Sequence, residues 1–493
     1  MVRDGYDTVI VGGGAAGCAL ARRLGDLDGA SVLLLEARPD QRADTPTEWH
    51  DGWTLPTLPD WGYEAEPGAD GSTPRLRRGR LLGGTSWLTR FAVRGSTADV
   101  DAWADAGNPG WAFEEVLPAF RRVETDLDLG ADPWHGTAGP LPITRYPGLA
   151  RSDIHEALLE AFAAGGFPSI DDHNAPGAVG VGPMPMSSRG GVRVTSVDAY
   201  LPEHARIPGL TVRADAPVAT ITFAGRRATG VRLADGAPIA ADRVIVAAGT
   251  YGSPALLLRS GIGPGDDLRA LDIAVVSELP GVGANLADHP GVDLDLGWRG
   301  AGRDGPVLHT IATWRSTGTP AHAAQDLMFW ISDPEGDDAG VYLDPILLKP
   351  ASRGSVRLRS ADPADPPRIE LPGLREPSDI DRLVEGYRRG LELARDPAIR
   401  ARCADPPPDV PDDQPALARH VVANAYSIPH VVGTCAMGPS PAAGAVVDAS
   451  GRVHGVDDLY VVDASIIPEP PSGFPHLVTL MLAEHLATRI AEV

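Results

Sequence analysis

Apolar residues gather into short runs along the chain, and the first of these runs sets the pattern. Residues 6–11 (YDTVIV) form a run without helical spacing, and a glycine-rich turn follows at once. The next segment, 18–24, is predicted to be a helix, and a second apolar run, 31–35, ends in the carboxylate of Glu36. Because a continuous apolar run is typical of a strand covered on both faces, we predict a strand–turn–helix–strand unit of a parallel sheet.

Further apolar runs divide the rest of the chain between helices and short strands. Between 292 and 368 the runs are broken by glycine and proline, which is typical of an antiparallel sheet. Ser253 is predicted to be the N-cap of a helix, and Pro254 its first residue. Ser378 is predicted to cap a second helix over 379–394. The other predicted strands are 210–213, 218–223, 228–233, 243–249 and 459–463, and the other predicted helices are 114–124, 154–164 and 477–490.

The first turn carries candidate chemistry. Gly12, Gly14 and Gly17 occupy the three glycine positions of G-x-G-x-x-G, with Ala15 and Ala16 between the second and third. The first glycine allows a tight turn, the second lets a pyrophosphate approach the backbone, and the third lets the helix pack closely on the sheet. Glu36 stands where a carboxylate accepts hydrogen bonds from ribose hydroxyls. The unit predicts a dinucleotide site, and the alternative is a structural turn in another α/β fold.

Composition and charge indicate a globular protein and argue against a nucleic-acid partner. The sequence has 493 residues, of which 43% are hydrophobic and 22% charged, as in ordinary globular proteins. Its formal net charge of −23 repels phosphate backbones, so we expect no nucleic-acid partner. The one dense basic run, 75–80, fits a neighbour of a cofactor phosphate or a solvated face equally well.

The cysteines, the N-terminal segment and the apolar runs indicate in which cellular compartment the protein is expected. Cys18, Cys403 and Cys435 are too few and too scattered for a disulfide framework, and no cluster of cysteine and histidine predicts a metal. The first strand begins within six residues of the N-terminus, so we expect no signal peptide. No apolar run reaches the length of a membrane helix. A soluble, cytoplasmic protein is expected.

Several longer motifs follow the first one in a fixed order. They are 79–86 (GRLLGGTS) with Arg94-Gly95, 248–263, 281–290 (GVGANLADHP), 430–438 (HVVGTCAMG) and 454–465. With these motifs the chain resembles, over nearly its whole length, the glucose–methanol–choline (GMC) oxidoreductases, which are FAD-dependent alcohol oxidases and dehydrogenases. Within the family it looks most like bacterial choline-dehydrogenase-like members, with the shorter actinobacterial branch that includes mycofactocin-associated dehydrogenases as a nearer match.

The resemblance implies a fold class and a cofactor. The fold combines α/β and α+β parts: a Rossmann-like FAD-binding domain built from discontinuous segments (1–98, 200–291 and 440–493) and an antiparallel-sheet substrate domain (99–199 and 292–439). The cofactor-binding residues that it implies are Gly12, Gly14, Ala15, Ala16, Gly17, Glu36, Gly83, Gly84, Thr85, Thr89, Arg90, Val218, Asp463 and Ala464.

The resemblance also implies a catalytic pair, His430 and His476, and the chemistry agrees. Oxidation of an alcohol removes a hydroxyl proton and passes a hydride to flavin N5, and histidine is the natural base near neutral pH. We expect His430 to be the base and His476 to orient the oxygen as a second donor. The rate should fall as the pH drops through a histidine-like pKa of roughly 6 to 7. His289, His454 and His485 are expected to be structural.

Two departures from the family pattern affect these expectations. Relatives that hold flavin covalently carry a histidine where this chain has Leu88, so the FAD is expected to be non-covalent. Thr89 replaces the usual Asn, and Arg90 stands where a small residue is common. The Arg90 cation is expected at the flavin edge or the substrate, and the alternative is an ion pair with a nearby carboxylate.

The predicted function is oxidation of an alcohol CH–OH group to an aldehyde or ketone. Partners are a small-molecule alcohol and an electron acceptor, either O2 or a respiratory or artificial acceptor. One alternative is an FAD-containing lyase resembling hydroxynitrile lyases, and another is a flavin-binding protein without turnover. The sequence does not determine the alcohol, the choice between oxidase and dehydrogenase, or the oligomeric state.

Overall fold

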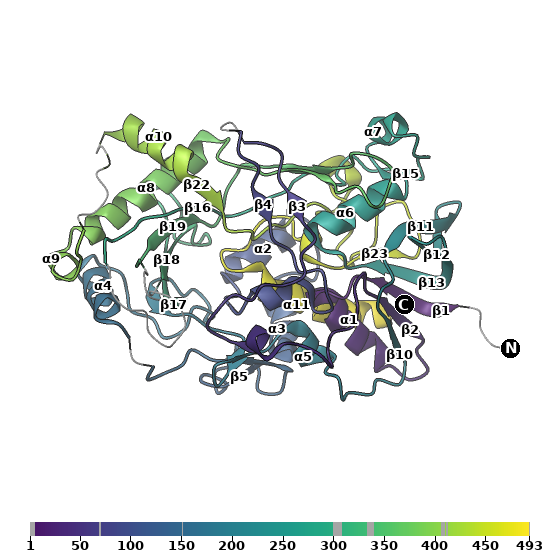
Figure 1. The fold of residues 1–493 in the computed structure, drawn as a ribbon, viewed down its shortest axis with the longest axis horizontal. Helices are drawn as coiled ribbons and strands as arrows, with labels where there is room; N and C mark the ends of the chain where they lie inside the picture. The colour runs from purple at the N-terminus through teal and green to yellow at the C-terminus, as the bar shows by residue number, and fades with distance from the viewer. Residues whose placement is uncertain are drawn as a thin grey trace.

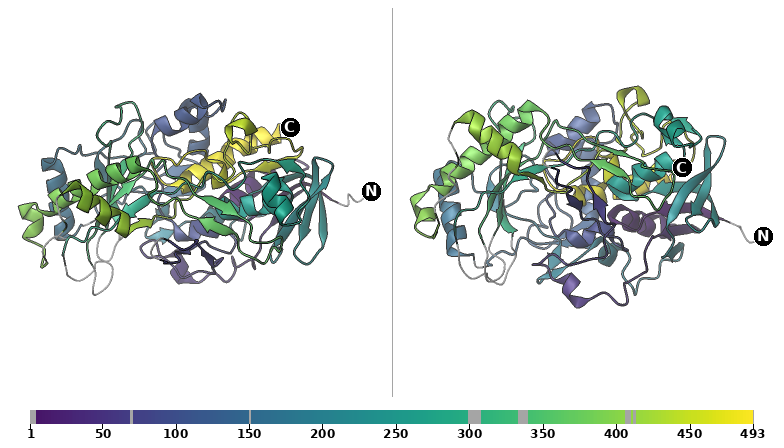
Figure 2. Two further views of the ribbon diagram at one scale, coloured as in Figure 1. Left: turned by 90° about the horizontal axis from the view of Figure 1, so that it is seen from above. Right: turned by 45° about the horizontal axis from the view of Figure 1, so that its top comes forward.

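Two sheets lie toward opposite ends of the long axis of the molecule, and helices fill the space between them (Figures 1 and 2). The computed structural model describes residues 5–68, 71–149, 151–298, 308–332, 340–405, 410 and 413–492. Within this part of the chain, none of the helices combines the length and the apolar character needed to cross a bilayer.

The first sheet confirms the predicted parallel unit. β1 (Tyr6–Val11) lies between β2 (Val32–Leu35) and β13 (Pro238–Val246), and all of these pairs are parallel. β10 (Leu210–Arg213) extends the sheet beyond β2, and β23 (Leu459–Val461) pairs with β13. Three distant parts of the sequence therefore build one sheet, as expected of a Rossmann-like fold assembled from separate segments.

An antiparallel extension continues the first sheet. β11 (Val218–Ala224) and β12 (Arg227–Leu233) form a hairpin, and β12 pairs with the first half of β13. This pairing makes β13 begin at Pro238, five residues before the predicted start. Local apolar character marked only the second half of this strand, which is buried between β1 and β23.

The second sheet is antiparallel, as predicted, and has six strands. Its order is β22 (Ala425–Ser427), β16 (Pro290–Val292), β19 (Leu343–Leu347), β18 (Leu327–Ser332), β17 (Leu308–Trp314) and β7 (Val181–Pro183). Helix α8 (Pro377–Ala394) packs on β18 and β19, and the other helices at this end are α4 (Asp153–Ala164), α9 (Pro397–Arg400) and α10 (Gln414–Asn424). Side chains from the sheet and these helices form a core of their own.

Helices α1 (Ala15–Gly25), α3 (Phe113–Val123) and α11 (Pro475–Ala491) pack together beside the first sheet. The buried carboxylate of Glu484 on α11 accepts from Arg23 on α1 and from the hydroxyl of Tyr200 on α5 (Ser196–Tyr200). Other helices are η1 (Thr47–His50), η2 (Gly84–Leu88), α2 (Thr97–Asp105), α6 (Gly249–Arg259), α7 (Gly265–Ala270), η3 (Pro441–Ala443) and η4 (Ala464–Ile466). Short strands are β3 (Tyr63–Glu64), β4 (Arg75–Leu76), β5 (Glu124–Asp126), β6 (Leu141–Ile143), β8 (Ser188–Arg189), β9 (Val192–Arg193), β14 (Ile262–Gly263), β15 (Ser277–Glu278), β20 (Ser355–Arg357) and β21 (Arg368–Glu370).

The predicted start of helix α6 was wrong. The helix begins at Gly249, four residues before the predicted cap Ser253, because the carboxylate of Asp463 accepts from the Gly249 N–H at 2.9 Å. Pro254 therefore lies inside the helix, where it leaves the carbonyl four residues earlier without a backbone donor. That carbonyl belongs to Thr250, and it accepts instead from the hydroxyl of Thr434 at 2.6 Å.

Two more predicted helix starts were wrong by two residues. Helix α8 begins at Pro377 with Glu376 at its N-cap, because proline at the first position already has a helical φ. Helix α11 begins at Pro475 for the same reason. His476 therefore stands in the first turn of the last helix and not before it.

Candidate active site

The glycine turn after β1 forms an open cradle. A Cβ atom at Gly12 would lie 2.5 Å from the carbonyl oxygen of Ala247, and one at Gly17 would lie 1.9 Å from that of Gly12. A Cβ atom at Gly14 would meet nothing within 4 Å. Gly14 is also the N-cap of α1, and no side chain caps this helix start. The cradle thus combines space with helix amides, which fits the diphosphate of a dinucleotide.

The second glycine turn lies against the first. Gly83 donates from its N–H to the carbonyl of Gly13 at 2.7 Å. Gly84 has φ +54°, and a Cβ atom there would lie 2.9 Å from the Cα of Gly14. Thr85 follows in η2. The structure therefore brings together the two glycine motifs that the sequence analysis assigned to one cofactor.

The remaining predicted cofactor residues lie on several different elements of the structure. Glu36 is buried at the end of β2, and its Oε2 accepts from the N–H of Gly13 at 3.0 Å. Burial raises the pKa of Glu36, although hydrogen bonds from backbone amides oppose the shift. Val218 begins β11. Asp463 caps η4, which begins with Ala464, and it also accepts from Gly249.

His430 is partly exposed, and the buried His289 lies against it. Nδ1 of His430 is 3.1 Å from Nδ1 of His289, and the two rings are nearly perpendicular. Asp288 supports both residues, since its Oδ1 accepts from the backbone N–H of His289 at 2.8 Å and from that of His430 at 2.7 Å. Its other oxygen accepts from the hydroxyl of Ser427. The carboxylate therefore fixes two chain segments, and the two rings face each other as a consequence.

His476 is the other predicted catalytic residue, and it follows two residues after Phe474, which contacts His430. The ring of Phe474 packs on that of His430 at a centroid distance of 4.9 Å. His476 follows two residues later, in the first turn of α11, with its Nε2 3.2 Å from the hydroxyl oxygen of Ser196. The other ring nitrogen, Nδ1, is buried and has no hydrogen-bond partner in the described structure.

Burial keeps these histidines neutral. It lowers the pKa of His430 well below the ordinary value, with the nearby His289 and Arg78 as further causes. Burial also lowers the pKa of His289 to about 3 and that of His476 to about 4. Conversely, burial raises the pKa of Asp288 to about 6. At neutral pH the site therefore contains uncharged imidazole rings, each able to accept a proton at one nitrogen.

Aromatic side chains form a wall beside His430. Trp330 from β18 stacks on the His430 ring at 6.4 Å, and Phe91 contacts both Trp330 and Phe474 at centroid distances of 5.6 and 5.5 Å. These side chains belong to a small separate core that joins the second sheet to the loops around the first. The wall offers an apolar surface and few hydrogen-bonding groups.

Two buried arginines lie behind this wall. Arg90 is 3% exposed, and its guanidinium lies over the ring of Phe91 at 5.1 Å. Arg193 donates to the carbonyl of Thr89 at 3.0 Å. Burial and the charge of Arg90 lower the pKa of Arg193 to about 10. Thr89 and Arg90 thus lie beside the buried Arg193, and the role of Arg90 toward flavin or substrate stays a prediction.

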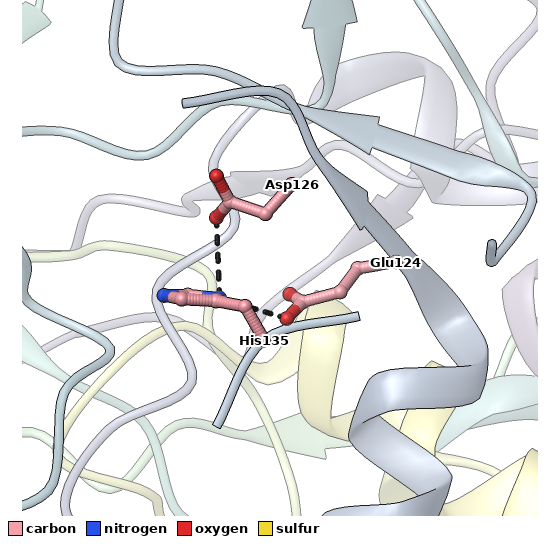
Figure 3. Close-up of side chains that lie close together, drawn as sticks. All are labelled: Glu124, Asp126 and His135. Atoms are coloured by element: carbon pink, nitrogen blue, oxygen red, sulfur yellow. Dashed lines mark hydrogen bonds and ion pairs between the residues drawn. The ribbon is translucent and has the colours of Figure 1, made fainter. Parts of the chain in front are cut away.

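A separate group of buried charges has the spacing of a metal site (Figure 3). Nδ1 of His135 is 2.9 Å from Glu124 and 3.2 Å from Asp126, while its Nε2 is 3.0 Å from Asp172. Arg94 pairs with Glu124 at 2.9 Å. Both ring nitrogens of His135 thus face carboxylates, which requires a protonated, cationic imidazole.

Arg145 completes the group, with its guanidinium 2.9 Å from Asp126 and 2.6 Å from Asp172. Three cations then face three carboxylates, so the charges balance without an added ion. Burial acts to lower the pKa of His135, but the hydrogen bonds to Asp172 and Glu124 outweigh it and raise the pKa to about 9. We interpret the group as an ion-pair network, and the expectation of no metal centre stays a prediction.

The parallel sheet with its glycine cradle, together with neutral histidines under an aromatic wall, defines a nucleotide-dependent oxidoreductase. Two family profiles, both described as GMC oxidoreductase, match residues 6–291 and 350–483. The chain belongs to this family.

Individual relatives agree with the family assignment. The chain is 35% identical to a 5-(hydroxymethyl)furfural oxidase from Methylovorus sp. (strain MP688), with 98% of both chains covered. It is 34% identical to an oxygen-dependent choline dehydrogenase from Pseudomonas fluorescens (strain SBW25), covering 98% of this chain and 93% of the relative. The crystal structure of pyridoxine 4-oxidase from Mesorbium loti has a TM-score of 0.89 and 31% identity, covering 99% of this chain and all of the other. The protein is an FAD-dependent oxidoreductase that acts on alcohol groups.

Sequence reasoning missed three residues of this site. It treated His289 as structural, and it assigned no role to Asp288 or Ser196. A signal for the first two was present, because Asp288 and His289 end the motif 281–290. Ser196 gave no signal, since a serine at a helix start is ordinarily part of a cap.

Proposed function

We propose that the protein oxidises an alcohol with His430 as the base that removes the hydroxyl proton. The observation that carries this proposal is the contact between His430 and the buried His289, together with a pKa of His430 that desolvation holds below its ordinary value. A base must be unprotonated to accept, and burial holds His430 in that form at neutral pH. His476 is proposed to orient the substrate oxygen from the first turn of α11.

The contact between the two rings supports one tautomer of His430. The His289 ring lies near the backbone carbonyls of Pro471 and Leu348. The Nε2 atom of His289 is buried and forms no hydrogen bond of good geometry in the described structure, but carbonyls only accept, so those nearby favour a proton on this nitrogen, which points away from His430. His289 Nδ1 then accepts from the Nδ1–H of His430, and Nε2 of His430 keeps a free lone pair. In this arrangement His289 positions the base, and Nε2 of His430 receives the proton.

The residues around the glycine cradle fit FAD, which when bound supplies the acceptor for the hydride. We propose that the amides at Gly14 and at the start of α1 bind its diphosphate and that Glu36 binds its ribose. The other residues proposed to contact it are Gly12, Ala15, Ala16, Gly17, Gly83, Gly84, Thr85, Thr89, Arg90, Val218, Asp463 and Ala464. The open space at Gly14 and the uncapped helix start support this assignment.

The substrate class follows from the aromatic wall and the nearby cations. Phe91, Trp330 and Phe474 would pack against an aromatic or other apolar group on the carbinol carbon. Arg90, behind Phe91, would repel a quaternary ammonium group such as that of choline. We therefore propose a neutral or anionic substrate with a hydroxymethyl group on an aromatic ring. The relatives named for 5-(hydroxymethyl)furfural and pyridoxine oxidation support this choice.

An anaerobic panel of alcohols, followed by flavin absorbance, tests the function. Aromatic hydroxymethyl compounds should bleach the flavin faster than choline or short aliphatic alcohols. A lyase would cleave a cyanohydrin without bleaching, and a binding protein would show neither reaction. Air or an artificial acceptor, added afterwards, then identifies the acceptor. If none of the alcohols reduced the flavin, the proposed reaction would be wrong.

The bound FAD is predicted to leave the polypeptide on acid or heat denaturation. Leu88 stands where covalently flavinylated relatives have histidine, and an aliphatic side chain offers no nitrogen to the flavin methyl group. Absorbance of the supernatant after precipitation measures the released flavin. Yellow colour that stays with the precipitated protein would contradict the prediction.

The rate of flavin reduction is predicted to stay constant from about pH 6 to pH 9 and to fall only at lower pH. The sequence placed the acidic limb at roughly 6 to 7, but burial lowers the pKa of His430 below its ordinary value of about 6.5. Protonation removes the base, so the rate should fall as the pH drops through this lowered pKa. Stopped-flow reduction across pH 4.5–9 measures the limb, and a midpoint at or above about 6.5, the ordinary histidine value, would show that a solvated group controls the rate.

The division into domains and the location also remain proposals. We propose that segments 1–98, 200–291 and 440–493 form the FAD-binding domain and that 99–199 and 292–439 form the substrate domain. The first sheet and the glycine cradle support the former, and the second sheet supports the latter. We also propose a cytoplasmic location, supported by the buried thiols Cys18 and Cys435.

A further inference from the structure

Lys349 is the only lysine among the 43 lysine and arginine residues of the sequence. It follows β19 of the second sheet, and its side chain is 20% exposed. The ammonium donates to the carbonyl of Pro470 at 2.6 Å and to Oδ1 of Asp99 at 3.0 Å. A carboxylate oxygen of Glu469 lies 3.8 Å away. Three oxygens thus surround one partly buried cation.

The segment 468–474 that Lys349 contacts leads directly into the active site. Phe474, at its end, packs on the ring of His430, and His476 follows in α11. Asp99, on α2, accepts at Oδ2 from the N–H and the hydroxyl of Ser472 at 2.7 and 2.6 Å. Asp99 is 2% exposed and depends on Lys349 for its counter-charge.

We propose that Lys349 is a positioning residue for the catalytic pair, a role that rests on the function proposed above. Lys349 holds segment 468–474 against α2 and the second sheet. His430 follows β22 of that sheet, whereas His476 belongs to α11 beside the first sheet. The distance between the two histidines therefore depends on this link. Small displacements of catalytic groups lower rates strongly, so the link matters to turnover.

The choice of lysine fits this role. An ammonium group directs three donors toward oxygens around a single point, whereas a guanidinium is planar and larger. The chain uses arginine at every other cationic position outside the N-terminus and its histidines. An arginine at position 349 would keep the charge but would push Pro470 and Asp99 apart.

Lys349 also acts on the histidine pair through its charge. After burial, Lys349 is the next cause that lowers the pKa of His289. The other charged or titratable groups facing the pair are Asp288 and Arg78. Removal of the lysine charge should therefore raise the pKa of His289. Because this ring contacts His430, the acidic limb of the rate profile should move to higher pH. A contact that only supported the fold would leave this limb in place.

The test compares Lys349→Met, Lys349→Arg and the double variant Lys349→Met/Asp99→Asn, each loaded with FAD. In Lys349→Met, we expect hydrogen exchange in peptides covering 468–476 to accelerate. Flavin reduction should slow by about 10- to 100-fold, and the acidic limb should move upward. Lys349→Arg should keep the limb but not restore the rate. The control Arg269→Met removes an exposed cation paired with Asp266 and should behave as wild type.

Different results separate this inference from the proposed function. Normal exchange and an unchanged acidic limb in Lys349→Met would overturn the role of Lys349 while leaving alcohol oxidation intact. If wild type reduced no flavin with any alcohol, the proposed function would fail, and the exchange measurement would still decide whether Lys349 holds the segment. Where Lys349→Met does not fold, the double variant removes the uncompensated Asp99 charge. Wild-type exchange in that variant would equally overturn the inference.

Discussion

His430→Ala is expected to slow flavin reduction by about 10²- to 10⁴-fold, which is the usual contribution of a positioned base. The fold and the FAD should be retained, because Asp288 holds this segment through the backbone N–H and not through the imidazole. Anaerobic stopped-flow reduction with the best alcohol of the panel measures the effect. A rate equal to that of wild type would assign the base to another residue.

Two variants help to interpret this result. His476→Asn should cost less, since an amide can still donate to the substrate oxygen. His289→Ala removes the acceptor proposed for the Nδ1–H of His430, so it should lower the rate without abolishing it and should alter the pH profile. If His289→Ala left both quantities unchanged, the proposed tautomer of His430 would have no kinetic role.

His135→Leu is expected to destabilise the protein by about 3–5 kcal/mol, because it leaves buried carboxylates without their cation. Nδ1 of His135 faces Glu124 and Asp126 (Figure 3). Its Nε2 faces Asp172, so both ring nitrogens are engaged. The shift of the urea midpoint for the FAD-loaded protein measures the loss. The control Arg22→Ala breaks a half-exposed ion pair with Asp26 and should cost less than about 1 kcal/mol.

The same network predicts a pH dependence of stability with a definite sign. The folded-state pKa of His135 is raised to about 9, above the unfolded value of about 6.5. Its contribution is therefore complete below about pH 6.5 and is lost as the pH rises through about 9. Wild-type stability should fall across this window, and His135→Leu should lack that part of the fall. An equal fall in both proteins would mean that His135 is neutral in the folded state, which would reopen the question of a metal ion between these ligands.

The sequence by itself determined the features that depend on local geometry. The run 6–11 marks β1 because its apolar β-branched residues stand together without helical spacing, which is typical of a strand buried on both faces. Gly12 and Gly17 mark the cradle because any Cβ atom there would collide with the backbone. The antiparallel second sheet was also predictable, since glycine and proline between short apolar runs limit strand length.

Tertiary structure alone decided which distant groups meet. The residues of the pair His289 and His430 are 141 positions apart, and the cap that Asp463 provides for Gly249 spans 214. Lys349 and Pro470 are separated by 121 positions. Hydrophobic periodicity reports how one segment is covered, but it contains no information on which other segment covers it. The contact between His289 and His430, the true start of α6 and the contact of Lys349 with segment 468–474 therefore follow from how the two sheets pack around the central helices, and not from any single stretch of sequence.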